Sequence, residues 1–319
     1  KPGNLVLGAN SDLEMLRQLA ARASKNGAHI WPQLGHAGAL SHYPISQPEG
    51  PSALEIGSFQ CAGMSLTKVK QLPNIYAEAA LLAKEVGFTG IQIHAGHGFL
   101  LSQFLSPLFN RRNDQYGGSI EARCQIIVEI IDKVRRTVGA SFPIGIKLNS
   151  TDQLEGGLTQ EDALGAIRIL NQTSVDLIEL SGGTYFPGAK SSSVDFSQRA
   201  QDVTSIPLVA TGGFKTRAQA LSSLASGAVD MVGMARAMVL NPSLAKDWLA
   251  NTGDDPAFPR FEATPSGGIT AWYTMLLTAL GNDDENTFAL DLTSAIRLYD
   301  ERDESRCTKW RKMFSHYSP

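Results

Sequence analysis

Hydrophobic and polar positions along the chain follow two alternating patterns. Segments with apolar residues three and four positions apart, typical of helices, recur between short runs that are almost wholly apolar. The runs are too uniformly apolar for a sheet with one wet face, which indicates parallel strands buried on both sides. We therefore predict six strands, at residues 29–34, 90–94, 143–148, 175–180, 206–210 and 229–233.

Polar capping residues and glycines predict where the intervening helices begin and end. The predicted starts are Ser11 with Glu14, Pro73, Ser119, Thr159 with Asp162, Thr216 with Gln219, and the residue after Asn241-Pro242. The predicted ends lie near Gly27, Val86, Val138 and Gly227. Strands that alternate with helices predict an α/β fold, and periodicity alone does not choose between a doubly wound sheet and a closed barrel.

The C-terminal segment has a different character. Thr270-Ala271-Trp272-Tyr273 opens an apolar helix, and a charged helix is expected near Ala295 to Arg306. We therefore predict two parts, residues 1–253 with the strand–helix alternation and residues 254–319 as a helical extension packed on the first part.

Composition narrows the class of protein. The chain has 319 residues, of which 43% are hydrophobic and 18% are charged, and its formal net charge is −3. We expect a large buried core, no nucleic-acid partner in the absence of a basic stripe, and no membrane partner, because no apolar run approaches roughly 20 residues. Three cysteines without a C-x-x-C spacing indicate reduced thiols in a cytoplasmic protein, with no metal site.

Polar and glycine-rich residues gather where the predicted strands end, which is the face on which α/β barrels place their sites. Gly212-Gly213 precede a helix, and Arg236 follows one strand–helix unit later. Backbone N–H groups at such glycines, together with an arginine, would hold a phosphate. Two ordinary turns and a surface arginine would give the same pattern.

His94 and His97 end one strand, and Lys147 ends the next. The two histidines could be a structural pair, a zinc pair that lacks a third ligand, or two N–H donors to a carbonyl oxygen or an anion. A buried lysine needs a partner, since an unpaired buried charge is costly. The candidate partners of Lys147 are Asp152, Glu155 and Glu179.

Several stretches together resemble the old yellow enzyme family. They are Gln33-Leu34-Gly35-His36-Ala37-Gly38, Ile93 to Pro107, Asn110 to Ser119, and Glu179 to Tyr185. The resemblance covers nearly the whole chain to about Leu280. It implies a (β/α)8 barrel of the TIM type that carries FMN, uses NADH or NADPH as reductant, and reduces or isomerises an activated alkene or enone.

The resemblance also implies a role for each site residue. Gln33 would hydrogen-bond the pyrimidine edge of FMN, and Lys147 would lie beside flavin N1. His94 and His97 would hold the carbonyl oxygen of a conjugated carbonyl substrate over the flavin. The residues implied for the FMN phosphate are Gly212, Gly213, Ala235 and Arg236.

Phe99 departs from the family pattern. The family often has a tyrosine at this position, whose hydroxyl protonates the substrate, and phenylalanine has no proton to give. Alkene reduction would then need another donor in the substrate pocket, such as Tyr185 or water.

The number of strands is a second departure. The six predicted strands correspond to strands three to eight of the family, so strands one and two, about 60 residues, are apparently absent. Three explanations are open: another segment or companion chain supplies them, a neighbouring copy in a homo-oligomer covers the edges, or the chain is a shortened member. Such a member could be a flavin-free, non-redox enzyme, for example an isomerase or cyclase of a biosynthetic pathway, or a binding protein.

Overall fold

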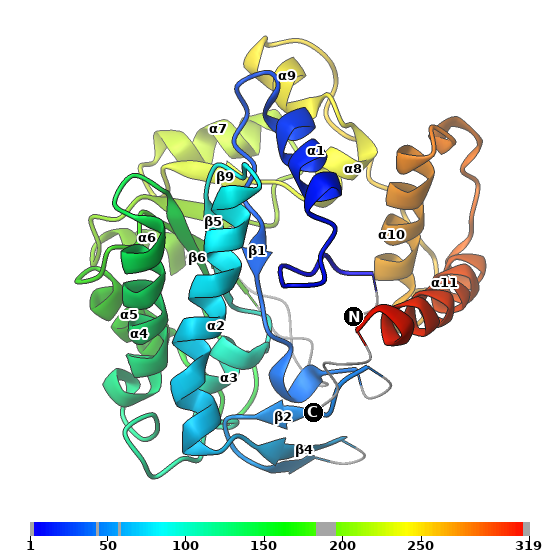
Figure 1. The fold of residues 1–319 in the computed structure, drawn as a ribbon. Helices are drawn as coiled ribbons and strands as arrows, with labels where there is room; N and C mark the ends of the chain where they lie inside the picture. The colour runs from blue at the N-terminus through cyan, green and yellow to red at the C-terminus, as the bar shows by residue number, and fades with distance from the viewer. Residues whose placement is uncertain (1–2, 43–44, 57–58, 183–195, 315–319) are drawn as a thin grey trace. The chain divides into compact units, whose positions relative to one another are not determined.

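The computed structural model describes residues 3–42, 45–56, 59–182 and 196–314 (Figure 1). These residues form two compact units, which are described separately. The described residues of the larger unit fall within 5–210 and 227–231. Those of the smaller unit are 3–4, 211–226 and 232–314.

A six-stranded sheet carries the fold, and its strands lie side by side in chain order. They are β1 (Gln33–Leu34), β5 (Ile91–Ala95), β6 (Ile144–Asn149), β7 (Leu177–Ser181), β8 (Leu208–Thr211) and β9 (Met231–Gly233). The four pairings from β1 to β8 are all parallel. The predicted α/β fold is therefore confirmed, with β1 and β5 to β8 mutually parallel and β9 next to β8 in the sheet.

The strand β1 is shorter than the predicted run of residues 29–34. It is an edge strand among the described residues and pairs only with β5, so one neighbour alone holds it extended. Before β1, the Ile30 N–H donates to the hydroxyl of the loop residue Thr89, and the Thr89 N–H donates to the Ile30 carbonyl. The indole of Trp31 lies against Gly90 and Gly145, where an added Cβ would come within 2.5 Å and 3.1 Å of the ring.

Most predicted helix starts agree with the structure. Ser119 caps α4 (Ile120–Val138), Thr159 and Asp162 form the capping box of α5 (Gln160–Leu170), and Thr216 and Gln219 form that of α7 (Arg217–Ala225). The helix expected after Asn241-Pro242 is α9 (Leu244–Leu249).

Two predicted helix starts are wrong. Asp12, not Ser11, caps α1 (Leu13–Ser24), because the Ser11 hydroxyl turns back to bond Val6 and Gly8. The helix α2 (Leu66–Glu85) begins after the cap Ser65 and continues through Pro73. Its buried face runs on either side of the proline, so tertiary packing outweighs the missing N–H.

The core of the larger unit lies between this sheet and its covering helices, where α2 packs along α4 (Figure 1). Strand β6 is buried at every position except Lys147, which is intermediate. The sequence did not predict α3 (Leu100–Leu105), α6 (Phe196–Gln201), or a small sheet of β2 (Glu49–Gly50), β3 (Leu54–Ile56) and β4 (Phe59–Gly63).

The smaller unit contains both predicted C-terminal helices, α10 (Gly268–Gly281) and α11 (Leu292–Phe314), which pack together. It also contains the short helix α8 (Arg236–Leu240). The ring of Trp272 lies edge-on to Phe261 and Phe288, and its indole N–H donates to the Leu290 carbonyl at 2.9 Å.

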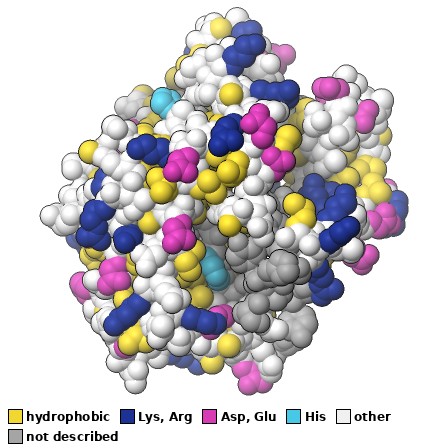
Figure 2. Space-filling model, in the orientation of Figure 1, with side chains coloured by type: hydrophobic (Ala, Val, Ile, Leu, Met, Phe, Trp, Pro, Cys, Tyr) yellow, Lys and Arg dark blue, Asp and Glu magenta, His cyan; other side chains and the backbone are white. Residues whose placement is uncertain are grey.

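Charged side chains of both signs are interspersed over the molecular face drawn in Figure 2. Within the described parts of the chain, no helix combines the length and the apolar character that a bilayer span requires.

Candidate functional site

His94 and His97 lie together at the carboxyl end of β5. His94 belongs to the strand, and His97 follows in a turn with a positive φ of 59°. The Asn149 side chain at the end of β6 holds this turn, since its Oδ1 accepts from the His97 N–H at 2.8 Å. The two imidazole rings are edge-on, with centroids 5.1 Å apart, so the predicted pair is adjacent in space.

Both imidazoles are neutral at physiological pH. Burial, with repulsion from Lys147 and from His97 once that ring is protonated, lowers the pKa of His94 to about 3, against the opposing effect of Glu179. Burial and Lys147 lower the pKa of His97 to about 4. Nδ1 of His94 accepts from the Gly96 N–H at 3.3 Å, which places the imidazole proton on Nε2. The pair therefore presents neutral hydrogen-bonding groups, not cations.

We expect neither histidine to titrate between pH 8 and pH 5. In the unfolded chain an imidazole takes up its proton near pH 6.5, whereas the folded pKa values are about 3 and 4. The unfolded state thus binds more protons below pH 6.5, and the pair lowers the free energy of unfolding as pH falls from 6.5 towards 4. Nitrogen-15 NMR of the imidazoles, assigned with His94→Ala and His97→Ala, measures this, and a titration step near pH 6.5 would contradict it.

Ser181 is a site residue to which the sequence analysis assigned no role. It ends β7, and its hydroxyl lies 2.9 Å from Nε2 of His97. Ser181 and Asn149 end β7 and β6, and His94 is the last residue but one of β5, so the three lie near the carboxyl ends of neighbouring parallel strands, which share one edge. This position at the carboxyl end of a neighbouring strand is the sequence signal that could have identified Ser181.

Glu179 is the partner of Lys147. The ammonium Nζ lies 2.8 Å from Oε1 of Glu179, and the two side chains are only 12% and 14% exposed. Asp152 is instead buried in its own loop, where it accepts from the Leu158 N–H at 2.9 Å. The buried lysine is thus paired with the carboxylate of the adjacent strand, one of the three partners that the sequence left open.

Gln33 contacts Gln92, a residue that the sequence analysis did not single out. The Gln33 amide donates to Oε1 of Gln92 at 2.5 Å, and the Gln92 amide donates to Oε2 of Glu179 at 2.6 Å. Gln33 and Lys147, both predicted to face FMN, are therefore joined through Gln92 and Glu179.

Phe99 lies beside the histidine pair. Its ring is edge-on to that of His94, with centroids 5.1 Å apart. The phenylalanine ring has no hydroxyl and so cannot donate a proton. The other predicted pocket residue, Tyr185, lies outside the described residues.

The predicted phosphate residues lie in the smaller unit. Gly212 and Gly213 have φ angles of +107° and +85°, and a Cβ at either would meet no atom within 4 Å. Next to them, the Thr211 hydroxyl is buried without a hydrogen-bond partner among the described residues. Ala235 and Arg236 are exposed, and the Arg236 guanidinium lies 5.8 Å from the centre of the Tyr273 ring. An open glycine turn, an unsatisfied hydroxyl and an exposed guanidinium suit an anion.

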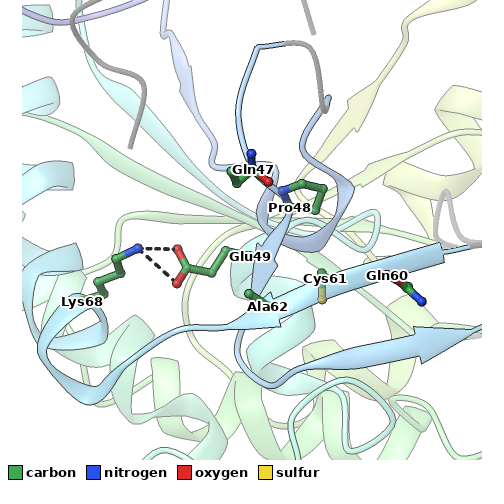
Figure 3. A pocket seen from close by; sticks show the side chains of 7 residues that line it. All are labelled: Gln47, Pro48, Glu49, Gln60, Cys61, Ala62 and Lys68. Carbon is green, nitrogen blue, oxygen red and sulfur yellow. Dashed lines mark hydrogen bonds and ion pairs between the residues drawn. The ribbon is translucent and has the colours of Figure 1, made fainter.

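A separate cavity of about 620 Å³ lies beside the small sheet of the larger unit (Figure 3). Lys68 and Glu49 form an ion pair on its wall, at 2.9 Å. Its lining residues are Gln47, Pro48, Glu49, Gln60, Cys61, Ala62 and Lys68. None of the predicted site residues lines it, so we do not assign it to the site. The described residues contain no cluster of three or more metal-ligating side chains.

Comparison with known proteins gives a consistent result. A family model described as NADH:flavin oxidoreductase / NADH oxidase matches residues 2–251. The chain is 34% identical over 275 residues to the NADH-dependent flavin oxidoreductase iliE of Neonectria sp. (strain DH2), a match that covers 73% of this chain and 36% of that protein. The corresponding match to iliE of Hypocrea jecorina covers 55% of that protein. The chain thus spans between a third and a little over half of these relatives.

A bacterial relative is covered more completely. The chain is 33% identical to the NADPH dehydrogenase of Geobacillus sp. (strain WCH70), over 75% of this chain and 71% of that protein. Among solved structures, the old yellow enzyme homologue from Zymomonas mobilis superposes with a TM-score of 0.69 at 22% identity, over 82% of this chain and 78% of that one. At that identity, the likeness shows the fold alone, which is the predicted TIM-barrel type.

Proposed function

Because this chain belongs to the NADH:flavin oxidoreductase / NADH oxidase family, we propose that it acts as an FMN-dependent oxidoreductase, with an activated alkene or enone as substrate and NADH or NADPH as reductant. Both nicotinamides are included because its relatives comprise an NADH-dependent flavin oxidoreductase and an NADPH dehydrogenase. A cytoplasmic location remains a prediction.

The single observation that carries the proposal is the neutral imidazole pair beside a buried lysine. His94 and Lys147 are register partners on adjacent strands, and His97 lies 5.1 Å from His94 between ring centroids. Preorganised N–H donors in a buried site stabilise negative charge that develops on a carbonyl oxygen. The pair thus suits the polarisation of a conjugated carbonyl compound, whose β-carbon becomes the acceptor of a hydride.

Within each unit, taken by itself, some residues suit a part of FMN. In the larger unit, Gln33 would bond the pyrimidine edge and Lys147 would offer a cation to N1. In the smaller unit, the open turn at Gly212 and Gly213, with Arg236, would hold a phosphate. When bound, FMN would supply the hydride-transfer chemistry between the nicotinamide and the alkene. The protein's residues would bind and orient the flavin and the substrate, and would polarise the substrate carbonyl.

The visible spectrum of the purified protein, before and after incubation with excess FMN and desalting, tests this function. We expect flavin absorption close to one equivalent, and bleaching on anaerobic addition of NADH or NADPH. A folded protein that stays colourless would contradict the proposal. Turnover by such a colourless protein would favour a flavin-free, non-redox enzyme, the alternative that the missing hydroxyl at Phe99 makes worth testing.

Arg236→Leu should weaken the binding of FMN but not of riboflavin, which has no phosphate. A charge-assisted hydrogen bond contributes about 1.5 to 3 kcal/mol, so we expect the Kd for FMN to rise by about ten- to a hundredfold. Fluorescence titration with both flavins measures the two changes. Arg260→Leu, at another exposed arginine of the same unit, is the matched control. An equal effect on riboflavin would contradict a phosphate contact.

Phe99→Tyr should speed alkene reduction if proton transfer limits it. The new hydroxyl would extend from a ring that already lies beside His94. General acid catalysis contributes about 10²- to 10⁴-fold, so a gain within that range is expected in the oxidation of reduced enzyme by an enone. Phe109→Tyr, at a buried phenylalanine outside the site, is the control. An unaltered rate would show that protonation by residue 99 is not limiting.

A further inference from the structure

Four polar side chains form one hydrogen-bonded line across strands β1, β5, β7 and β6. Gln33 donates to Gln92 at 2.5 Å, Gln92 donates to Glu179 at 2.6 Å, and Lys147 donates to the other oxygen of Glu179 at 2.8 Å. Glu179 is the only carboxylate in this line, and both of its oxygens accept hydrogen bonds.

The chemistry of Lys147 and Glu179 fixes the direction of every hydrogen bond in the line. A lysine ammonium can only donate, and an ionised carboxylate can only accept. Gln92 must therefore turn its NH₂ group to Glu179 and its carbonyl oxygen to Gln33. Gln33 in turn must use one N–H to bond Gln92, which leaves its own carbonyl oxygen and second N–H for a ligand.

An amide without such a constraint can present its oxygen and nitrogen either way round, since the two groups have nearly the same shape. The side chain of Gln33 is exposed, so packing does not select one orientation. The hydrogen bond to Gln92 is the contact that does so.

We propose that Glu179 is a positioning residue that, through Gln92, fixes the amide orientation of Gln33 and so the hydrogen bonds that Gln33 offers to the pyrimidine edge of FMN. The inference rests on the proposed function, because the contact between Gln33 and FMN is part of that function. The pyrimidine edge of a flavin presents an N3–H donor between two carbonyl acceptors. Only one amide orientation sets the Gln33 oxygen against N3–H and its N–H against a carbonyl.

Gln92→Met separates this role from a merely structural one. It breaks the line between Gln33 and Glu179 but leaves the Lys147–Glu179 ion pair intact. We expect the Kd for FMN to rise at least about twofold, because only about half of the freely rotating Gln33 amides then present the competent orientation. Gln33→Met should weaken FMN binding at least as much, and the double variant should bind no more weakly than Gln33→Met alone.

The relative affinity for FMN and its N3-methylated analogue reports amide orientation directly. The analogue has lost the N3–H donor, so the unaltered protein should prefer FMN, and Gln92→Met and Glu179→Gln should each reduce that preference at least about twofold. A general loosening of the fold would instead weaken the binding of FMN and of the analogue by the same factor. Glu129→Gln is the control, since Glu129 is a half-buried glutamate on α4 that accepts from Tyr116 at 2.9 Å and from Gln125 at 3.0 Å.

The outcomes separate the two proposals. If the unaltered protein does not bind FMN, the proposed function is wrong and this inference is overturned with it. If FMN binds but the preference over the methylated analogue is unchanged in Gln92→Met, or the effects of Gln33→Met and Gln92→Met simply add, the positioning role of Glu179 alone is overturned.

Discussion

His94→Ala combined with His97→Ala should abolish the charge-transfer absorption that a phenol gives with bound FMN, and should lower the rate of enone reduction about 10²- to 10³-fold or more. Removal of one preorganised donor from an oxyanion site typically costs about 10²- to 10³-fold. Both imidazoles are neutral hydrogen-bonding groups with rings 5.1 Å apart, so the double variant removes the whole site for the oxygen atom. Phenol titration and single-turnover oxidation by an enone measure the two effects.

His97→Asn offers a finer version of this test. It keeps a side-chain N–H but removes the imidazole that contacts the Ser181 hydroxyl. We expect this variant to retain more phenol affinity than His97→Ala, because a donor remains. His29→Ala, at an exposed histidine before β1, should leave phenol binding unchanged. Phenol affinity that survives the double alanine variant would place the ligand elsewhere.

The strands and most helix caps could be predicted because their signals are local. A capping box such as Thr159 with Asp162 lies within four residues, and the strand β6 is apolar except for Lys147 and Asn149 near its end. The start of α2 could not be predicted, since Pro73 is favoured at a first helical turn and only the buried face of the helix shows that it continues through the proline. Local preference was outweighed there by packing.

The residues of the site could be predicted more readily than the hydrogen bonds and ion pairs that join them. His94, His97 and Lys147 were identified from strand ends and from the family resemblance. Glu179 was one of three candidate carboxylates, because the choice among them depends on which strand pairs with β6 and in which register. Gln92 gave no signal of its own, since its role follows only from the hydrogen bonds on either side of it.

Arg123→Met should lower the free energy of unfolding by about 3 kcal/mol, because it removes the buried guanidinium from an ion pair with a partly exposed carboxylate and leaves two backbone carbonyls without their donor. The Arg123 side chain is 6% exposed, and its Nη2 lies 2.6 Å from the Asp162 carboxylate. The same guanidinium donates to the backbone carbonyls of Leu105 and Gly118. It therefore joins the end of α3, the turn before α4 and the capping box of α5. Urea unfolding of the variant measures the loss.

Arg199→Met is the matched control for this prediction. Arg199 also pairs with a carboxylate of α5, Glu161, but the two side chains are 42% and 73% exposed. Exposed ion pairs contribute about 0 to 1 kcal/mol, so the control should lose several times less free energy of unfolding than Arg123→Met. Arg123→Lys should also destabilise, because an ammonium lacks the planar fork that reaches two carbonyls and a carboxylate at once. Equal losses for Arg123→Met and Arg199→Met would show that burial of the guanidinium does not set its contribution.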